Sequence, residues 1–495
     1  MKKKGSMTVF LAMILVLTET LLFALGEYIR IYELKSLAQE YTDAAVESAF
    51  SEYNTYLWAN YQILAIDLGY GSNTTGTAVM QQRVIDFVSE DANPESGLSF
   101  NRLTAEFATV DNYSLLTDNG GNAIVSQGVT AAKTNLADNI LDLITDQLEG
   151  EEDIESVDIE SIVEEGTSTL NQAKEENAAA REKAIEERDP NHPVSDIPVP
   201  EEVEDNPLDV YARVKESMDK GAIYLVLGDT PTSAYEIEAG TLPSSRSLQV
   251  GNKDAATGQS LVDRALYTKY LLENMSYYGS DLEHDGFSYE LEYLANGQSS
   301  DQANLASTIE KLMLVREAAN YGAILKDTRL RNMASTLATT LTSFCPAAYG
   351  PVELAIIGAW AYMESILDIR LLLAGGKVAV IKNYDQWTVD VWNMTDFVNK
   401  DAMANNCENG LTYRQLLTGM LVLIPMDTLG IRTADILEDA LNTQENYGQV
   451  RLDNMLSSAE ISVSYSASPL FLNLFSINQT GIDGYSLTRT KNMEY

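Results

Sequence analysis

The sequence has few of the residues on which most metal, redox and nucleophilic sites depend. Among its 495 residues there are two histidines and two cysteines. Zinc sites, cysteine-based redox centres and Ser-His-Asp triads need such residues in clusters, so most sites of these kinds are excluded. Basic residues are also scarce, because 33 Lys and Arg stand against 73 Asp and Glu, which gives a net charge of −40. So acidic a surface repels phosphate backbones, and we expect no nucleic-acid partner.

Complete phosphate-binding and metal-binding motifs are missing as well. The sequence contains no G-x-x-x-x-G-K-[ST], no G-x-G-x-x-G and no H-E-x-x-H. Gly375-Gly376-Lys377 lacks the upstream glycine and the hydroxyl residue of a phosphate loop, and is more simply a helix C-terminal cap. The segment Asp118–Asn122 could offer oxygen ligands to calcium, but turn chemistry is the simpler interpretation. We therefore expect no metal site and no cofactor.

The most informative feature that is present is an apolar run at the N-terminus. It extends from Met7 to Leu25, follows Lys2-Lys3-Lys4, and contains Glu19 as its single charge. At about 1.5 Å per residue, a helix of this length nearly spans a hydrocarbon core of about 30 Å. The positive-inside rule then keeps the N-terminus in the cytoplasm and exports everything beyond Gly26. This predicts a cell-membrane protein whose bulk is extracytoplasmic and whose first partner is membrane lipid.

Two interpretations of this run compete. A cleaved signal peptide would use the small-x-small site Ala24-Leu25-Gly26, but its apolar stretch usually has only about 7–15 residues. An uncleaved or pilin-type anchor is favoured because the helical pattern continues beyond that site. Apolar residues recur at spacings of three and four, and no Gly or Pro interrupts residues 27–68. We therefore predict a transmembrane helix that continues into a long exported helix over 27–68.

Glu19 lies within the predicted span, where a carboxylate costs roughly 2–3 kcal/mol. It is either protonated or snorkelling near the interface, or it pairs inside the membrane with a charge on a neighbouring subunit.

Composition divides the remaining chain and predicts its fold class. We expect an α+β fold that is predominantly helical, with a large helical ectodomain and small β-sheet elements. Residues 1–26 would be the basic tip and anchor, 27–148 a stalk helix with a small β and helix portion, and 207–495 the main helical ectodomain with C-terminal strands. Residues 98–116 alternate like a pair of strands. Residues 149–206 are acidic and rich in proline, which predicts a charged helix followed by a mobile linker.

One apolar stretch in the predicted ectodomain carries charges. Val352–Leu373 is long enough to be mistaken for a membrane span, but its acidic and basic residues favour a core helix. Glu364 and Asp368 are four residues apart and share a helix face, where like charges destabilise each other. If buried, they need cations or one of them is protonated. The sequence offers three candidate cations: Arg316, Arg370 and Lys377. A structural ion network is the first interpretation, and a polar binding or catalytic cleft is the alternative.

The two cysteines, Cys345 and Cys407, both fall in the part that we expect to be exported. A disulfide between them would close a loop of about sixty residues and stabilise the fold by roughly 4 kcal/mol in the chain-entropy model. Two separate buried thiols fit the sequence equally well.

Several segments of the chain match the sequence pattern of a known family. They are Lys4–Leu11, Phe50–Asn54, Leu57-Trp58, Asn112–Asp118, Leu314–Glu317 with Asn320, Ala359–Ser365, Asp368–Leu372, Gly375–Val378, Lys382 and Leu411–Arg414. Together they resemble an uncharacterised branch of the TadE/TadG-like, Tad-pilus-associated membrane proteins of Gram-positive bacteria. The resemblance covers nearly the whole chain except the acidic insertion.

The resemblance implies a pilin-like assembly component whose partners are other pilus or secretion subunits. In pilins a peptidase cuts after a glycine that follows basic residues, and Gly5-Ser6 fits that cut. Pilins usually carry a glutamate at the fifth position after the cut, but here Phe10 occupies it and Glu19 lies nine residues later. The sequence therefore departs from the ordinary pilin pattern at this position.

Three functions are compatible with these observations. The first is a single-pass, surface-exposed structural or accessory component of a pilus-like adhesion or secretion apparatus, without enzymatic activity. The second is an extracytoplasmic module that binds a polysaccharide or partner protein through some of its 26 tyrosines. The third is a membrane-anchored hydrolase that uses carboxylates around Glu364 and Asp368.

Overall fold

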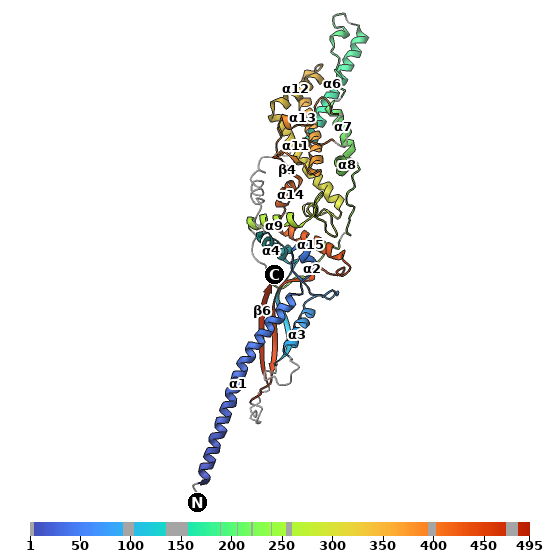
Figure 1. The fold of residues 1–495 in the computed structure, drawn as a ribbon. Helices are drawn as coiled ribbons and strands as arrows, with labels where there is room; N and C mark the ends of the chain where they lie inside the picture. The colour runs from blue at the N-terminus through green and yellow to red at the C-terminus, as the bar shows by residue number, and fades with distance from the viewer. Residues whose placement is uncertain are drawn as a thin grey trace. The chain divides into compact units, whose positions relative to one another are not determined.

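The structure is a computed structural model that describes residues 4–92, 103–134, 157–188, 190–204, 206–218, 221–238, 240–253, 260–394, 402–471 and 484–495. The fold is α+β and mostly helical, with one long N-terminal apolar helix and small antiparallel sheets, in agreement with the predicted class (Figure 1). Every feature below refers to these residues.

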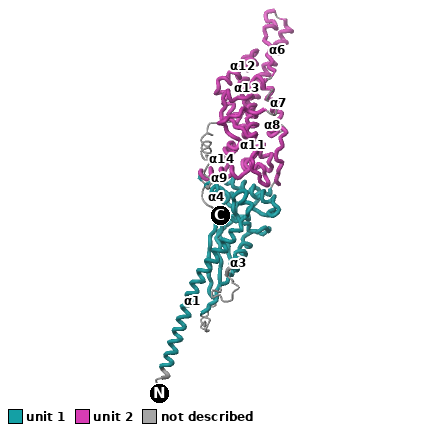
Figure 2. Tube along the Cα trace, in the orientation of Figure 1, with its two compact units in different colours: residues 1–134, 240–260, 426–495 teal, residues 135–239, 261–425 magenta. Residues whose placement is uncertain are grey.

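The chain divides into two compact units, each described here by itself (Figure 2). Unit 1 comprises residues 1–134, 240–260 and 426–495, and unit 2 comprises residues 135–239 and 261–425. The predicted main ectodomain 207–495 is therefore not one unit. The reason is that the C-terminal strands pair with a strand from the first quarter of the chain, which brings residues 426–495 into unit 1.

Unit 1 is built on a small antiparallel sheet. Its central strand, β5 (Met455–Ala467), pairs along one edge with β2 (Leu103–Leu115). Along the other edge it pairs with β1 (Ile66–Asp67) at its start and then with β6 (Tyr485–Glu494). Side chains of β5 alternate between buried and half-buried positions, as expected for a strand with one covered face. The predicted terminal strands are thus confirmed.

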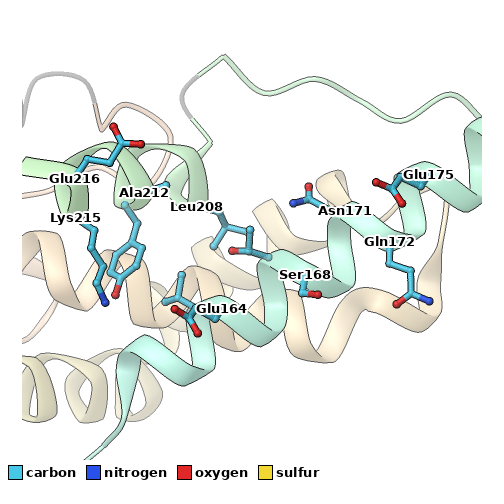
Figure 3. Close-up of a pocket in the computed structure, with 12 residues that line it drawn as sticks. Glu164, Ser168, Asn171, Gln172, Glu175, Leu208, Ala212, Lys215 and Glu216 are labelled. Carbon is cyan, nitrogen blue, oxygen red and sulfur yellow. The ribbon is translucent and has the colours of Figure 1, made fainter.

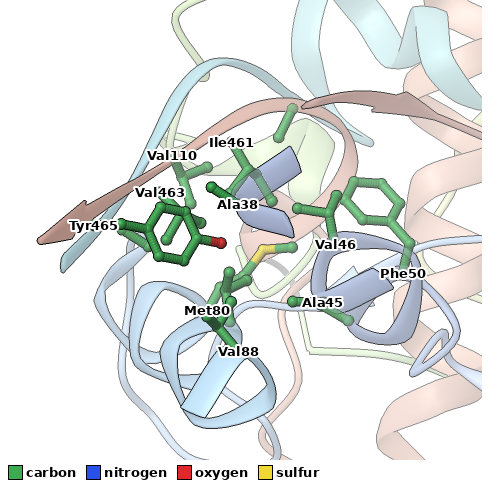
Figure 4. Packing of buried hydrophobic residues seen from close by; sticks show 14 of the residues in the cluster. Ala38, Ala45, Val46, Phe50, Met80, Val88, Val110, Ile461, Val463 and Tyr465 are labelled. Carbon is green, nitrogen blue, oxygen red and sulfur yellow. The ribbon is translucent and has the colours of Figure 1, made fainter. Parts of the chain in front are cut away.

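Two helices cover this sheet. They are α1 (Lys4–Phe50) and α3 (Ala78–Ala92). The buried face of α1 carries small residues, Ala38, Ala45 and Ala49, which let the helix approach closely, and Val46 and Phe50 fill the remaining space (Figure 4). The core of unit 1 is completed by residues of α3 and of the strands, among them Met80, Val88, Val110, Ile461, Val463 and Tyr465.

The prediction of one helix over 27–68 is wrong at its C-terminal end. The helix α1 ends at Phe50, and a separate short helix, α2 (Thr55–Tyr61), follows. Asn54 separates the two helices because its side chain accepts a hydrogen bond from Leu57 N at 3.0 Å and caps α2. The chain then turns so that Ile66 and Asp67 pair with β5.

The predicted pair of strands over 98–116 is replaced by the single strand β2. Residues 98–102 lie outside the described part, and the partner of β2 is β5, not a neighbour in sequence. The turn at residues 118–121 is confirmed, because Asn119, Gly120 and Gly121 all have positive φ. This turn opens α4 (Asp118–Thr134), which packs on α15 (Met426–Asn442), and a Cβ on Gly121 would lie 2.6 Å from the Gly430 carbonyl carbon. The remaining elements of unit 1 are η3 (Pro243–Ser245) and η7 (Leu452–Asn454).

Unit 2 is a helical domain around α13 (Tyr349–Leu373), which is buried along most of its length. This confirms that the apolar stretch 352–373 is a core helix. It ends in the predicted cap: Gly376 N donates to Leu371 O at 2.8 Å, Gly375 N donates to Leu372 O at 3.0 Å, and Gly375 has a φ of 86°. The helices that pack on α13 are α6 (Ile159–Glu187), α7 (Pro207–Met218), α8 (Ala222–Leu227), α11 (Asp301–Lys326) and α12 (Thr328–Leu341).

The remaining elements of unit 2 are short. They are α9 (Leu261–Asn274), α10 (Glu290–Asn296), α14 (Tyr413–Val422), the two-stranded sheet of β3 (Lys377–Val378) and β4 (Leu411–Thr412), and the 3-10 turns η2 (Val194–Asp196), η4 (Pro346–Ala348) and η5 (Tyr384–Gln386).

The acidic insertion 149–206 contributes a packed element to unit 2. The predicted charged helix is α6, and its apolar face packs on α13 through residues at helical spacing: Ile159, Val163, Gly166, Leu170 and Ala173. The proline-rich stretch after it folds back along α6, because Arg181 Nη1 donates to Ile197 O at 2.7 Å and Asn177 Nδ2 to Pro198 O at 3.2 Å. The sequence predicted a mobile linker for this stretch and did not predict these contacts. Residues 149–156, 189 and 205 lie outside the described part.

Candidate functional site

The N-terminal part of α1 is an apolar helix around which no described residue of unit 1 packs (Figure 1). Large side chains along it are mostly exposed, for example Met7 at 68% and Leu17 at 67%. Within the described residues, α1 is the one helix long and apolar enough to cross a membrane, with a mean hydropathy of 2.3 in its most apolar window. The hydroxyls of Thr18 and Thr20 donate to carbonyls one turn back, so both are satisfied inside the helix.

The surroundings of α1 change abruptly at Gly26, although the helix itself continues. After this residue one face of the helix becomes buried, starting with Glu27 and Arg30 and continuing with Leu34 and Ala38. One continuous helix therefore has a bare apolar first half and a second half that belongs to the core of unit 1. The two halves are mechanically coupled because the hydrogen-bond ladder of the helix is not interrupted between them.

A buried ion pair marks the change. Arg30 Nη1 lies 2.8 Å from Glu27 Oε1, and both side chains are only 3% exposed. The other oxygen of Glu27 accepts hydrogen bonds from the backbone N–H groups of Leu470 at 3.0 Å and Phe471 at 2.7 Å, while Arg30 donates to Ser468 O at 3.0 Å. The sequence did not reveal this arrangement, in which Glu27 and Arg30 bind residues 468–471 and which we call the Glu27–Arg30 clamp. An oppositely charged pair three residues apart was visible, but its partners lie more than 430 residues later.

Three residues predicted to act in the anchor lie in this helix. Gly5 and Ser6 are in its first turns, and their surroundings lie outside the described part. Glu19 is exposed on the apolar segment. The cleavage at Gly5 and the intramembrane pairing of Glu19 remain predictions.

The predicted charge network exists in the core of unit 2. Glu364 and Asp368 are both fully buried on successive turns of α13. The Lys382 ammonium contacts both carboxylates and lies 2.5 Å from Asp368 Oδ1. Arg316 of α11 donates from Nε to Asp368 Oδ2 at 2.9 Å. Two cations thus neutralise two carboxylates in the described core of the helix bundle, which is the arrangement that a buried charge requires.

Backbone groups and amides complete this network. Glu364 accepts hydrogen bonds from Val389 N at 2.9 Å and Thr388 N at 3.2 Å, and Arg316 donates to Ala379 O and Val380 O at 3.0 Å each. The network therefore ties the segment 379–389 to α11 and α13. Burial raises the pKa of Glu364, while the charge of Lys382 opposes this rise and that of Asp368 adds to it. Because no carboxylate oxygen is open to solvent, the geometry supports the structural interpretation and not a hydrolytic cleft.

The cations differ in part from those predicted. Arg316 is in the network, but Arg370 points elsewhere, since its Nη2 donates to Leu225 O at 3.0 Å and its Nη1 to Ala402 O at 3.3 Å. Lys377 is exposed at the start of β3. Its predicted place is taken by Lys382, which reaches the carboxylates because the chain turns back along α13 after the Gly375 cap.

The remaining candidates from the sequence are the possible calcium ligand Asp118 and the two cysteines. Asp118 accepts backbone hydrogen bonds from Leu115 N at 2.7 Å and Gly251 N at 3.1 Å, so its carboxylate stabilises the turn. Within the described residues no group of three or more His, Cys, Asp or Glu side chains could hold a metal ion. Cys345 and Cys407 are free thiols, so the disulfide alternative is not formed.

Comparison with known proteins places the chain in a family. A model of a family of unknown function (DUF5702) matches residues 199–467, which is more than half of the chain. The chain belongs to this family. No curated protein and no solved structure matches it. The DUF5702 region contains Arg316, Glu364, Asp368 and Lys382, and it ends at the last residue of β5. Helix α1 lies outside the DUF5702 region, and the family description assigns no activity.

A groove with a volume of about 680 Å³ lies between α6 and α7 in unit 2 (Figure 3). One wall, α7, is inside the DUF5702 region and the other, α6, precedes it. Hydroxyl and amide groups of Ser168, Asn171 and Gln172 line the groove together with carboxylates and Tyr211. Its one lining cation, Lys215, is engaged in an ion pair with Glu160. This chemistry suits a neutral or cationic polar ligand.

The tyrosines do not form the exposed strip that a sugar-stacking module would need. All 26 lie in the described residues, and only Tyr28, Tyr32 and Tyr384 are exposed. The others are buried or half-buried, and among the buried ones Tyr267 and Tyr270 stack with their ring centroids 5.8 Å apart. The high tyrosine content thus serves packing more than surface binding.

Proposed function

We propose that this protein is a single-pass, membrane-anchored structural or accessory component of a pilus-like adhesion or secretion apparatus. Its N-terminus would lie in the cytoplasm, α1 would cross the bilayer, and both units would lie outside the cell. Lipid and other subunits of the apparatus would be its partners.

The observation that carries this proposal is the division of α1 into a bare and a packed half. Residues 7–25 expose a continuous apolar surface, which soluble domains do not leave to water. Residues 27–50 belong to the core of unit 1, so a force on the membrane segment would pass directly into the folded domain. The lysines at positions 2–4 and the acidic remainder support the orientation with the N-terminus inside.

The pilus-like role is supported by the resemblance of the N-terminal segments and by the arrangement of unit 1. A long helix whose apolar first half projects from an antiparallel sheet is the form that a pilin-like subunit requires. The buried state of Glu364 and Asp368 removes the main argument for a hydrolase. Phe10, at the place where pilins carry glutamate, favours a stably anchored accessory component over a filament subunit.

An extracytoplasmic binding module remains the second candidate because of the groove between α6 and α7. Its hydroxyl, amide and carboxylate groups match the hydroxyls of a polysaccharide. Polysaccharide binding by the protein lacking residues 2–25 tests this candidate. Binding that is lost when Gln172→Ala is introduced would favour the second function.

Fractionation of cells tests the anchor. We expect the full chain in the membrane fraction after a carbonate wash. A variant lacking residues 2–25 should be in a soluble fraction, and its circular dichroism should lose only the signal of the deleted helical residues. Protease added to intact cells or protoplasts should digest the full chain but not a cytoplasmic marker. Recovery of the full chain in the cytosol, protected from protease, would contradict both the anchor and the orientation.

The role in an apparatus is tested by Glu19→Gln. If Glu19 pairs with a neighbouring subunit, this variant should insert normally but co-purify with fewer pilus or secretion subunits in mild detergent. Thr20→Val, at a neighbouring position whose hydroxyl bonds only its own helix, is the matched control. Equal co-purification by both variants and the wild type would show that Glu19 has no assembly role. Absence of any such subunit from the wild-type complex would refute the role in an apparatus itself.

A further inference from the structure

A second apolar element lies beside α1 where the bare half of the helix ends. It is the tip that follows β5, with Leu470 and Phe471 half-buried at its described end. The ring of Phe471 packs against Gly26, so that a Cβ built on Gly26 would lie 3.5 Å from the ring. Phe471 is therefore level with Gly26, the residue that follows the apolar run.

The position of this tip is determined by buried charges. Glu27 accepts hydrogen bonds from the N–H groups of both Leu470 and Phe471, and Arg30 donates one to Ser468 O. Charge-assisted hydrogen bonds of this kind are stronger than neutral ones, and three of them hold Ser468, Leu470 and Phe471. The tip is thus fixed to the helix and does not depend on the sheet alone.

The surface around this point has the composition of a membrane interface. Tyr28 is 68% exposed, Ile29 58% and Tyr32 73%, all on faces of α1 that the tip leaves uncovered. Tyrosines are enriched where a membrane protein passes through the headgroup region, since the ring is apolar and the hydroxyl is polar. Residues 468–471 carry no charge, in a chain whose net charge is −40. Anionic headgroups therefore do not repel this tip as they would repel the acidic surface.

From these observations we infer that Leu470 and Phe471 lie in the headgroup region of the bilayer, so that unit 1 contacts the membrane at two points, α1 and the tip after β5. This inference rests on the proposed membrane anchor. Glu27 and Arg30 are positioning residues in this arrangement: they hold the tip at the depth where α1 leaves the hydrocarbon. Two contacts restrict the tilt of unit 1 on the membrane, which one helix would leave free.

Tryptophan fluorescence of the full chain in lipid nanodiscs tests this inference. The four native tryptophans, at positions 58, 360, 387 and 392, lie outside the apolar segment and outside residues 468–471 in the sequence. We expect Phe471→Trp to add fluorescence that lipids brominated near the headgroup quench more strongly than lipids brominated near the acyl-chain end. Asn492→Trp, at an exposed position towards the far end of β6, is the matched control and should add unquenched fluorescence.

A third variant separates this inference from the proposed function. Leu17→Trp, in the middle of the apolar run, should be quenched most by the deep bromines. If Leu17→Trp is quenched and Phe471→Trp is not, the tip does not touch lipid and the inference is overturned while the anchor stands. An unquenched but blue-shifted Phe471→Trp would mean that protein, such as a second copy of the chain, covers the tip, and would overturn the inference as well. If Leu17→Trp is unquenched, the anchor itself fails.

The positioning role of Glu27 has its own readout. Glu27→Gln in the Phe471→Trp background should reduce shallow quenching, because the amide no longer provides two anionic acceptors. Quenching of Leu17→Trp, measured in a protein that carries Glu27→Gln and the native Phe471, should stay unchanged. Undiminished quenching of Phe471→Trp would overturn the role assigned to the clamp.

Discussion

Lys382 shows at the residue scale how this chain keeps charge inside a helix bundle. Its ammonium lies between Glu364 and Asp368, which would otherwise repel each other on one face of α13. Arg316 and Asn320 occupy the second oxygen of Asp368. A paired buried charge contributes little net stability, but removing one partner is costly because the other charge remains in a medium that solvates it poorly.

Lys382→Met should therefore destabilise unit 2 strongly. The methionine fills much of the volume but leaves two adjacent buried carboxylates with a single cation, and we expect a loss of about 3–5 kcal/mol in the free energy of unfolding. Lys377→Met, at the exposed position that the sequence had suggested, should change it by less than about 0.5 kcal/mol. Urea unfolding of the variant lacking residues 2–25 measures both. Similar effects from the two substitutions would mean that Lys382 does not bear the charge balance.

At the scale of elements, the contact between α6 and α13 depends on the absence of a side chain. Gly166 faces α13, and a Cβ there would lie 2.3 Å from the Cβ of Ala355 and 2.5 Å from Pro351 O. The acidic helix can approach the core helix closely only because of this glycine. The sequence indicated a charged helix in this region, but not that it would pack, since the apolar face of α6 is narrow.

Gly166→Ala should separate α6 from α13 and cost about 1–3 kcal/mol, as overpacking of a dense contact usually does. Gly322→Ala is the matched substitution in another helix of unit 2. No heavy atom beyond its own helix lies within 4 Å of a Cβ on Gly322, so alanine should stabilise the protein by about 0.5–1 kcal/mol through helix propensity. Thermal unfolding followed by circular dichroism should show shifts of opposite sign. A stabilising Gly166→Ala would show that the helices are not in close contact.

At the scale of the whole molecule, buried carboxyls determine how stability depends on pH. Burial raises the pKa of Glu292 to about 7, against hydrogen bonds from Tyr413 and Tyr278 N that lower it. Burial also raises the pKa of Glu317 to about 7, with the charge of Lys215 lowering it and that of Glu160 raising it. In the unfolded chain both groups return to an ordinary value near 4.5. Between these values the folded state binds more protons than the unfolded one.

The free energy of unfolding should consequently fall as the pH rises from about 4.5 to about 7, and then level off. At lower pH an opposite contribution appears, because Asp453 has a lowered pKa: burial raises it, but hydrogen bonds from Gln249 N, Arg246 and Arg451 more than offset this. We therefore expect the highest stability on the acid side of neutrality. Urea unfolding between pH 5 and pH 8 measures the slope.

Glu317→Gln provides the control for this pH dependence. It imitates the protonated carboxyl, so it should raise stability at pH 8 by up to about 3 kcal/mol, change stability near pH 5 by less than about 1 kcal/mol, and flatten the slope. A slope that is unaffected by Glu317→Gln would locate the pH dependence in other groups.

Features that depend on local pattern could be predicted from the sequence alone. The apolar run of α1, the core helix α13, the cap at Gly375 and the C-terminal strands all follow from periodicity, length and turn chemistry within short windows. Glu364, Asp368 and Arg316 could be placed in one network because buried like charges on one helix face require cations. The break of α1 after Phe50 was missed because no glycine or proline marks it.

Only the tertiary structure decided which distant segments meet. Three contacts show this: β2 pairs with β5, Lys382 and not Lys377 contacts the buried carboxylates, and Glu27 binds the tip after β5. In each case the local sequence pattern is compatible with other partners. Such partners are selected by the geometry of the packed chain, since burial requires each charge and each backbone group to find a partner within a few ångströms. Local physics therefore determined that α1 is apolar and helical, and long-range packing determined that its second half is the core of unit 1.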